Sequence, residues 1–93
     1  MNSYKIKYSN DAIKFLKKNK IIGIKFMKAF SDISNDYYSN LKYYDIKKIK
    51  DKKYNDIFRL RISKYRAIYR VIENEILIFV FVIDSRGDVY KNF

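Results

Sequence analysis

The residues best suited to chemistry are arginines on two neighbouring apolar segments. Arg59 and Arg61 lie two residues apart in a segment that alternates basic and apolar side chains, so both guanidinium groups project from one face of a strand. Arg66 follows after a short connection, and an antiparallel partner strand would bring it close to Arg61. Facing like charges destabilise a fold unless an anion binds between them, and phosphate suits guanidinium groups. The alternative is a solvated strand face whose cations prevent aggregation.

A second candidate cluster follows the longest apolar run of the chain, residues 76–83. Arg86 and Tyr90 come shortly after this run, where they would emerge from the end of a buried strand. A tyrosine has an unperturbed pKa of about 10, so Tyr90 can transfer a proton only if nearby cations favour the phenolate. The alternative is a polar tail in which Arg86 pairs with Asp84 or Asp88.

The composition limits the chemistry that is open to this chain. It has 21 Lys and Arg against 10 Asp and Glu, a net charge of +11 that favours acidic partners. It has no Cys and no His, which excludes disulfides, thiol nucleophiles, imidazole acid–base catalysis and the usual zinc ligands. Because Ile, Lys, Asn and Tyr are all abundant and have AT-rich codons, base composition can inflate the lysine count. The five arginines are therefore the more informative cations.

The length of 93 residues predicts a single domain over 1–93. Apolar residues make up 48% of the chain, enough for a small core. The apolar runs are too short for a signal peptide or a membrane-spanning helix, which predicts a cytoplasmic protein with no membrane partner.

The hydrophobic pattern predicts the elements that position these residues. Helical spacing predicts a helix over about 10–19 and a second that follows Lys20 and ends near Asn35. Residues 36–53 fit neither period and are expected to form a loop. Period-two or wholly apolar segments predict strands over 4–8, 57–62, 65–73 and 76–83. The last three should form an antiparallel meander, with 76–83 as a central strand covered by the helices on at least one side. The predicted fold is α+β, with an N-terminal strand and two helices packed on an antiparallel sheet in the order β-α-α-β-β-β.

Taken together, the segments resemble the RelE/ParE superfamily of toxins from bacterial and archaeal toxin–antitoxin pairs, over nearly the whole chain. The motifs that carry the resemblance occur in the order Lys48-Ile49-Lys50, Phe58-Arg59-Leu60-Arg61-Ile62, Tyr65 to Tyr69 and Arg86-Gly87-Asp88-Val89-Tyr90. The RelE branch implies a ribosome-dependent endoribonuclease that cuts mRNA and inhibits translation. It uses neither metal nor cofactor: the ribose 2′-oxygen attacks the adjacent phosphate, leaving a cyclic phosphate and a free 5′-hydroxyl.

The resemblance also assigns residues and partners. It implies catalytic roles for Arg66, Arg86 and Tyr90, and RNA or phosphate binding by Lys48, Lys50, Arg59 and Arg61. Arg59 and Arg61 stand where the branch commonly has lysines, and because a guanidinium does not titrate usefully, they are better suited to phosphate binding than to proton transfer. The implied partners are mRNA, the ribosome and a cognate antitoxin, whose binding segment should be acidic to complement this charge.

Two other functions remain open on the sequence. The ParE branch shares the scaffold but poisons DNA gyrase by protein contact, without catalytic residues. A basic nucleic-acid-binding domain with no chemistry would equally explain the charge. The presence of Arg66, Arg86 and Tyr90 together favours RNA cleavage.

Overall fold

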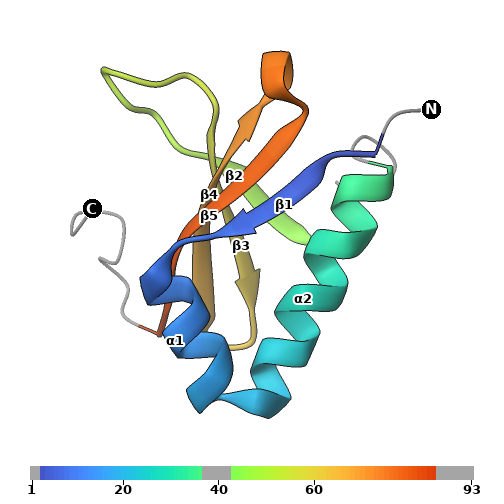
Figure 1. Ribbon diagram of the computed structural model, residues 1–93. Coiled ribbons are helices and arrows are strands. Elements are labelled where there is room, and N and C mark those ends of the chain that lie inside the picture. Colours follow the sequence, from blue (N-terminus) through green and yellow to red (C-terminus); the bar gives the residue numbers. More distant parts are fainter. Residues whose placement is uncertain (1–2, 37–42, 86–93) are drawn as a thin grey trace.

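The computed structural model describes residues 3–36 and 43–85, which form five strands in one sheet and two helices on one side of it (Figure 1). The elements are β1 (Lys5–Tyr8), α1 (Asn10–Lys18), α2 (Lys20–Asn35), β2 (Asp45–Lys48), β3 (Ile57–Ile62), β4 (Tyr65–Ile72), the 3-10 turn η1 (Glu73–Glu75) and β5 (Leu77–Asp84). The predicted α+β class is confirmed. Within the described residues, no helix combines the length and the hydropathy needed to cross a membrane.

The two helices begin and end where the sequence indicates. Ser9 caps α1, because its side-chain oxygen accepts a hydrogen bond from the Ala12 amide at 3.1 Å. The same hydroxyl donates to the Phe81 carbonyl, which ties the start of α1 to β5. Gly23 lies where α2 passes α1, and a Cβ there would be 3.1 Å from the Leu16 carbonyl oxygen. A larger residue would push the helices apart.

The sheet has the strand order β1-β5-β4-β3-β2. Strands β3 to β5 form the predicted antiparallel meander, and β2 also pairs antiparallel with β3. Strand β1 pairs parallel to β5, so the sheet is mixed. The central strand of the five is β4, and β5 lies between β1 and β4. The prediction of 76–83 as an interior strand is therefore right, and its place at the centre is wrong.

Strand β2 corrects the prediction of an unbroken loop over 36–53. Its four residues pair antiparallel with β3 and form one edge of the sheet. Three of the four are charged, so the segment shows no clear alternation of apolar and polar residues. Its strand character comes from the hydrogen bonds to β3 rather than from its own composition.

The core lies between the helices and the sheet. Phe26 and Phe30 of α2 and Tyr69 of β4 are fully buried there, and the rings of Phe30 and Tyr69 pack edge to face with their centroids 5.1 Å apart. Aromatic side chains supply much of the buried area in a chain this small.

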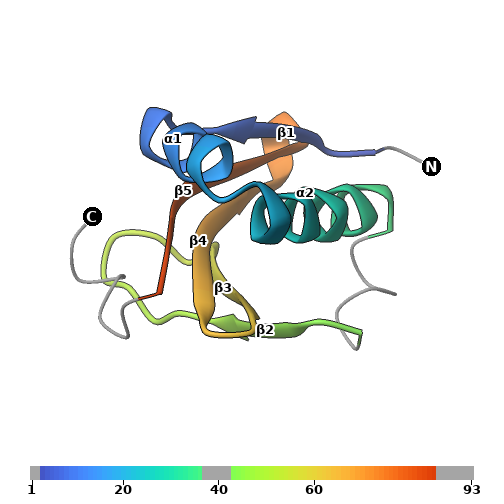
Figure 2. The ribbon, with the colours of Figure 1, turned by 90° about the horizontal axis from the view of Figure 1, so that it is seen from below.

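The opposite side of the sheet, here called the outer face, carries the candidate residues Arg59, Arg61 and Arg66. Figure 2 shows α2 on one side of β3 and β4 and the β2–β3 connection, residues 49–56, on the other. From β2 to β5, the outer face comprises Asp45, Lys47, Ile57, Arg59, Arg61, Arg66, Ile68, Arg70, Ile72, Leu77, Phe79, Val82 and Asp84. Ile57 and Ile68 are buried there with Ile49 and Phe81 against them, so this face has a small apolar cluster of its own.

Candidate functional site

The β3–β4 hairpin brings two arginines together. Arg61 lies directly opposite Arg66 in the antiparallel ladder, which confirms the proximity predicted from the sequence. The tight turn between them is made possible by Ser63, which has a φ of 58°. Asp45 lies opposite Arg61 on the β2 side, and Asp84 lies opposite Arg66 on the β5 side. Two neighbouring cations thus occupy the middle of a row that has a carboxylate at each end.

The hydrogen bonds of this row separate the roles of the arginines. Arg59 Nη2 donates to Asp45 Oδ1 at 2.6 Å, and the Arg59 side chain is only 20% exposed. Arg61 is exposed, and its Nε donates to the Ser63 carbonyl at 3.1 Å. An anion would have to compete with Asp45 for Arg59. Arg61 and Arg66 are therefore the better anion-binding pair on the outer face.

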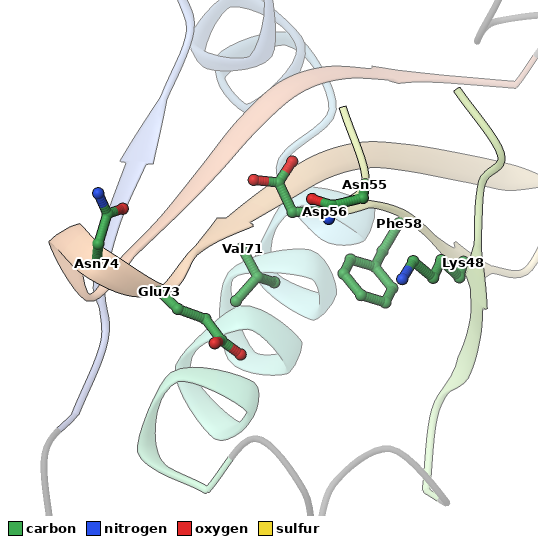
Figure 3. A pocket seen from close by; sticks show the side chains of 7 residues that line it. All are labelled: Lys48, Asn55, Asp56, Phe58, Val71, Glu73 and Asn74. Atoms are coloured by element: carbon green, nitrogen blue, oxygen red, sulfur yellow. The ribbon is translucent and has the colours of Figure 1, made fainter. Parts of the chain in front are cut away.

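Lys48 points to a different part of the molecule. It lies opposite Phe58 in the β2–β3 ladder and so on the helix side of the sheet. There it lines a hollow of about 370 Å³, together with Asn55, Asp56, Phe58, Val71, Glu73 and Asn74 (Figure 3). The hollow has both signs of charge, unlike a phosphate site. The structure thus does not bring Lys48 together with the arginines, and Lys50 is exposed just beyond the end of β2.

Arg86 and Tyr90 lie outside the described residues. The last described strand, β5, ends at Asp84, directly across from Arg66. The assignments of Arg86 and Tyr90 therefore remain predictions from the sequence.

The structure adds two cations to the outer face. Lys47 lies opposite Arg59, and Arg70 lies opposite Ile57. Arg70 forms a two-pronged ion pair with Asp56, with Nε–Oδ1 and Nη2–Oδ2 distances of 2.8 and 2.9 Å. These hydrogen bonds raise the pKa of Arg70 above its usual value. Arg70 could have been found from the sequence, because residues 66 and 70 of one strand share a face, whereas Lys47 required the strand that was missed.

The tyrosines with perturbed pKa values lie off the outer face and are held in the protonated form. Burial raises the pKa of Tyr8 to about 12. The hydrogen bond that Tyr44 donates to Asp32, 2.6 Å long, raises the pKa of Tyr44 to about 12 as well. In the described ranges, no group of three or more carboxylates is placed to hold a metal ion. What the described outer face can do chemically is bind an anion and stabilise negative charge.

Comparison with known proteins shows which solved structures share this fold. No family model and no curated protein matches the chain. Among solved structures, the RelE–RelB complex of Pyrococcus horikoshii matches with a TM-score of 0.75 and 23% identity, over 91% of this chain and 97% of that one. A free mutant of the E. coli toxin RelE matches with a TM-score of 0.71 and 17% identity, over 96% and 92%. The RelB–RelE complex of Methanococcus jannaschii matches with a TM-score of 0.69 and 23% identity, over 94% and 98%. This chain accordingly has the fold of the RelE toxins, as the order of its sequence motifs indicates.

Proposed function

We propose that this chain is the toxin of a type II toxin–antitoxin system and that it cleaves mRNA on the ribosome without a metal ion. The observation that carries the proposal is the pair Arg61 and Arg66, side by side on the outer face of a RelE-like fold. A fold alone does not specify an activity. The paired guanidinium groups are the feature that suits a phosphate of the RNA backbone.

The chemistry proposed is attack of a ribose 2′-oxygen on the adjacent phosphorus. The bond from phosphorus to the 5′-oxygen of the next nucleotide breaks, which leaves a 2′,3′-cyclic phosphate and a 5′-hydroxyl. Negative charge increases on the non-bridging oxygens as the phosphorane forms. Arg61 and Arg66 would stabilise this charge, because they are already held next to each other before the substrate binds.

Proton transfer needs other residues, and Arg86 and Tyr90 are the proposed ones. Asp84 faces Arg66 across the β4–β5 ladder, and Arg86 follows Asp84 by only two residues. Because two residues span about 7 Å at most, Arg86 lies close to Asp84 along the chain, and its side chain could reach the neighbouring Arg66. Clustered guanidinium groups would lower the pKa of a nearby phenol, which is what Tyr90 needs to act as a general base or acid.

The proposal includes an antitoxin partner in the cytoplasm. Two of the three solved structures described above are complexes of a RelE protein with RelB, from P. horikoshii and M. jannaschii. A chain of net charge +11 favours an acidic partner segment, which speeds association and neutralises the cations of the outer face.

The experiment that tests the proposal is induction of the chain in growing cells, followed by pulse labelling. Amino-acid incorporation should fall at once, and mapping of mRNA ends from purified translating ribosomes should show new 5′ ends inside codons. An early fall in thymidine incorporation while translation continues would instead indicate a gyrase poison. Retained translation together with uncut mRNA would rule the proposal out.

A further inference from the structure

A tyrosine in the β2–β3 connection lies beside the outer face without belonging to its apolar cluster. Tyr54 is 36% exposed. The Arg70 guanidinium carbon lies 4.1 Å from the centroid of its ring, within the range of a cation–π contact. Since Arg70 projects from the outer face, Tyr54 lies on the same side of the sheet as Arg61 and Arg66.

The ring is held in place by contacts on both sides of Tyr54 in the chain. Asp51 Oδ1 accepts hydrogen bonds from the amides of Lys53 and Tyr54, at 2.7 and 3.0 Å. Both carboxylate oxygens of Asp56 accept hydrogen bonds from Arg70. The backbone carbonyl of Asp56 accepts a hydrogen bond from the Val71 amide at 3.0 Å. Asp56 thus fixes the Arg70 guanidinium that contacts the ring, and it also fixes the backbone near Tyr54 to strand β4. Such a ring loses little conformational freedom when a ligand packs on it.

The surroundings of the ring are cationic. Lys50, Lys52 and Lys53 are exposed in the same connection. Lys53 Nζ lies 5.9 Å from the ring centroid, near the limit of a cation–π contact, and its flexible side chain can move aside. An aromatic ring within a lysine-rich surface is the combination by which proteins bind single-stranded nucleic acid: the ring stacks on a base and the cations contact phosphates.

We propose that Tyr54 is a stacking platform for a base of the bound RNA, one that lies beyond the nucleotides held at Arg61 and Arg66. The inference rests on the proposed function and adds a base-contacting residue to it. Residues 66 and 70 are four positions apart on β4, which is about 13 Å along the strand. The platform would therefore contact a base near the cleaved bond rather than the reacting nucleotide. The bond-breaking chemistry does not depend on it.

The absence of tryptophan from the chain permits a direct test. The variant Tyr54→Trp retains an aromatic platform and introduces the only tryptophan of the chain, whose emission can be excited selectively. Its emission should be quenched when a short single-stranded oligoadenylate binds, and much less so by an abasic phosphodiester of the same length and charge. The variant Ile24→Trp is the control, because Ile24 is also exposed but lies on α2, on the side of the sheet opposite the outer face.

Affinity measurements complete the test. Tyr54→Leu should weaken oligoadenylate binding about tenfold or more and leave abasic binding unchanged, because one base stack contributes about that factor. Tyr54→Phe should bind like the unmodified chain, and unchanged melting of both variants would show that the connection is intact. Equal binding by Tyr54→Leu, equal weakening of the abasic ligand, or no oligoadenylate binding by the unmodified chain would overturn the inference.

These results are independent of the test of the proposed function. If the unmodified chain cuts mRNA on ribosomes but Tyr54→Leu binds oligoadenylate normally, the platform is wrong and the toxin assignment stands. If base-dependent binding at position 54 is found but no mRNA is cut, the chain binds RNA without the proposed reaction.

Discussion

Arg66 is the residue on which the proposed reaction depends most directly. It lies between Arg61 on β3 and Asp84 on β5, so its backbone is held by strands on both sides. A lysine would be a poor replacement at this position, because a single ammonium group cannot contact two phosphate oxygens in the planar, two-pronged geometry of a guanidinium.

Arg66→Ala should therefore slow mRNA cleavage on ribosomes by about 10²–10³-fold, the loss typical of one group that stabilises transition-state charge. Arg66→Lys should recover only part of the rate. Thermal unfolding should change little in either variant, and Lys14→Ala on the exposed side of α1 is the control for loss of one positive charge. Full activity of Arg66→Ala would contradict the role, and unfolding of the variant would show that Arg66 is structural.

The sequence identified the arginine pair but did not indicate on which face of the sheet the neighbouring lysines lie. Alternation on β3 and a short turn were enough to bring Arg61 and Arg66 together, because both are local features. Whether Lys47 or Lys48 joins them depends on the register of β2 against β3. A shift of one residue exchanges the two faces of a strand, and no local signal in a four-residue edge strand fixes that register.

At the scale of elements, the long apolar or alternating segments were predictable and the short polar one was not. Helices α1 and α2 and strands β3, β4 and β5 have the expected positions to within about two residues, because each carries a clear hydrophobic period. The parallel pairing of β1 with β5 joins segments about 70 residues apart in the sequence, so only tertiary packing determines it.

The connection between β4 and β5 contains a strained residue. Ile76 has a φ of 50°, a conformation that costs a β-branched side chain about 1–2 kcal/mol, and it is 37% exposed. Ile76→Asn should relieve part of this strain and raise the melting temperature by a few degrees, because asparagine tolerates positive φ. Ile76→Val keeps the strain and should not. If the asparagine variant melts at or below the valine variant, strain at this turn is not limiting.

The contact between α2 and the start of β2 should make stability depend on pH. Hydrogen bonds from Tyr44 and Lys28 hold the pKa of Asp32 below its usual 3.8, so folding is stabilised above that value and loses this contribution as the pH falls through the lowered pKa. The pKa of Tyr44, raised from 10.0 to about 12, adds stability that is present below pH 10.0 and is lost as the pH rises to about 12.

Tyr44→Phe should flatten both dependences, because it removes the largest cause of the Asp32 shift and the phenol itself. The free energy of unfolding in urea, measured from acid to alkaline pH, provides the test. Tyr43→Phe is the matched control, since Tyr43 is the adjacent exposed tyrosine. Identical pH profiles for Tyr44→Phe and the unmodified chain would show that the hydrogen bond does not contribute in solution.

At the scale of the whole molecule, the charge of the chain supports the partner proposed for it. A net charge of +11 on 93 residues repels itself at low salt, and the outer face concentrates several of these cations on one side of the sheet. If the chain has the proposed toxin function, these cations must be covered until the toxin is released. A long, partly disordered acidic segment suits that purpose, because it can wrap a small domain and can be removed by proteolysis.

Co-expression with the small reading frame next to its gene should therefore yield a stable complex that co-purifies. The partner's binding segment should have an excess of Asp and Glu for fast association, and apolar anchors for affinity. Raising the salt should slow association much more than it speeds dissociation, because screening acts mainly on long-range attraction. In the complex, the antitoxin should cover Arg59, Arg61 and Arg86 or displace the segment that carries Tyr90, and protection of the arginines from chemical modification distinguishes the two. A chain that purifies without the partner, or a partner segment with net positive charge, would contradict this account.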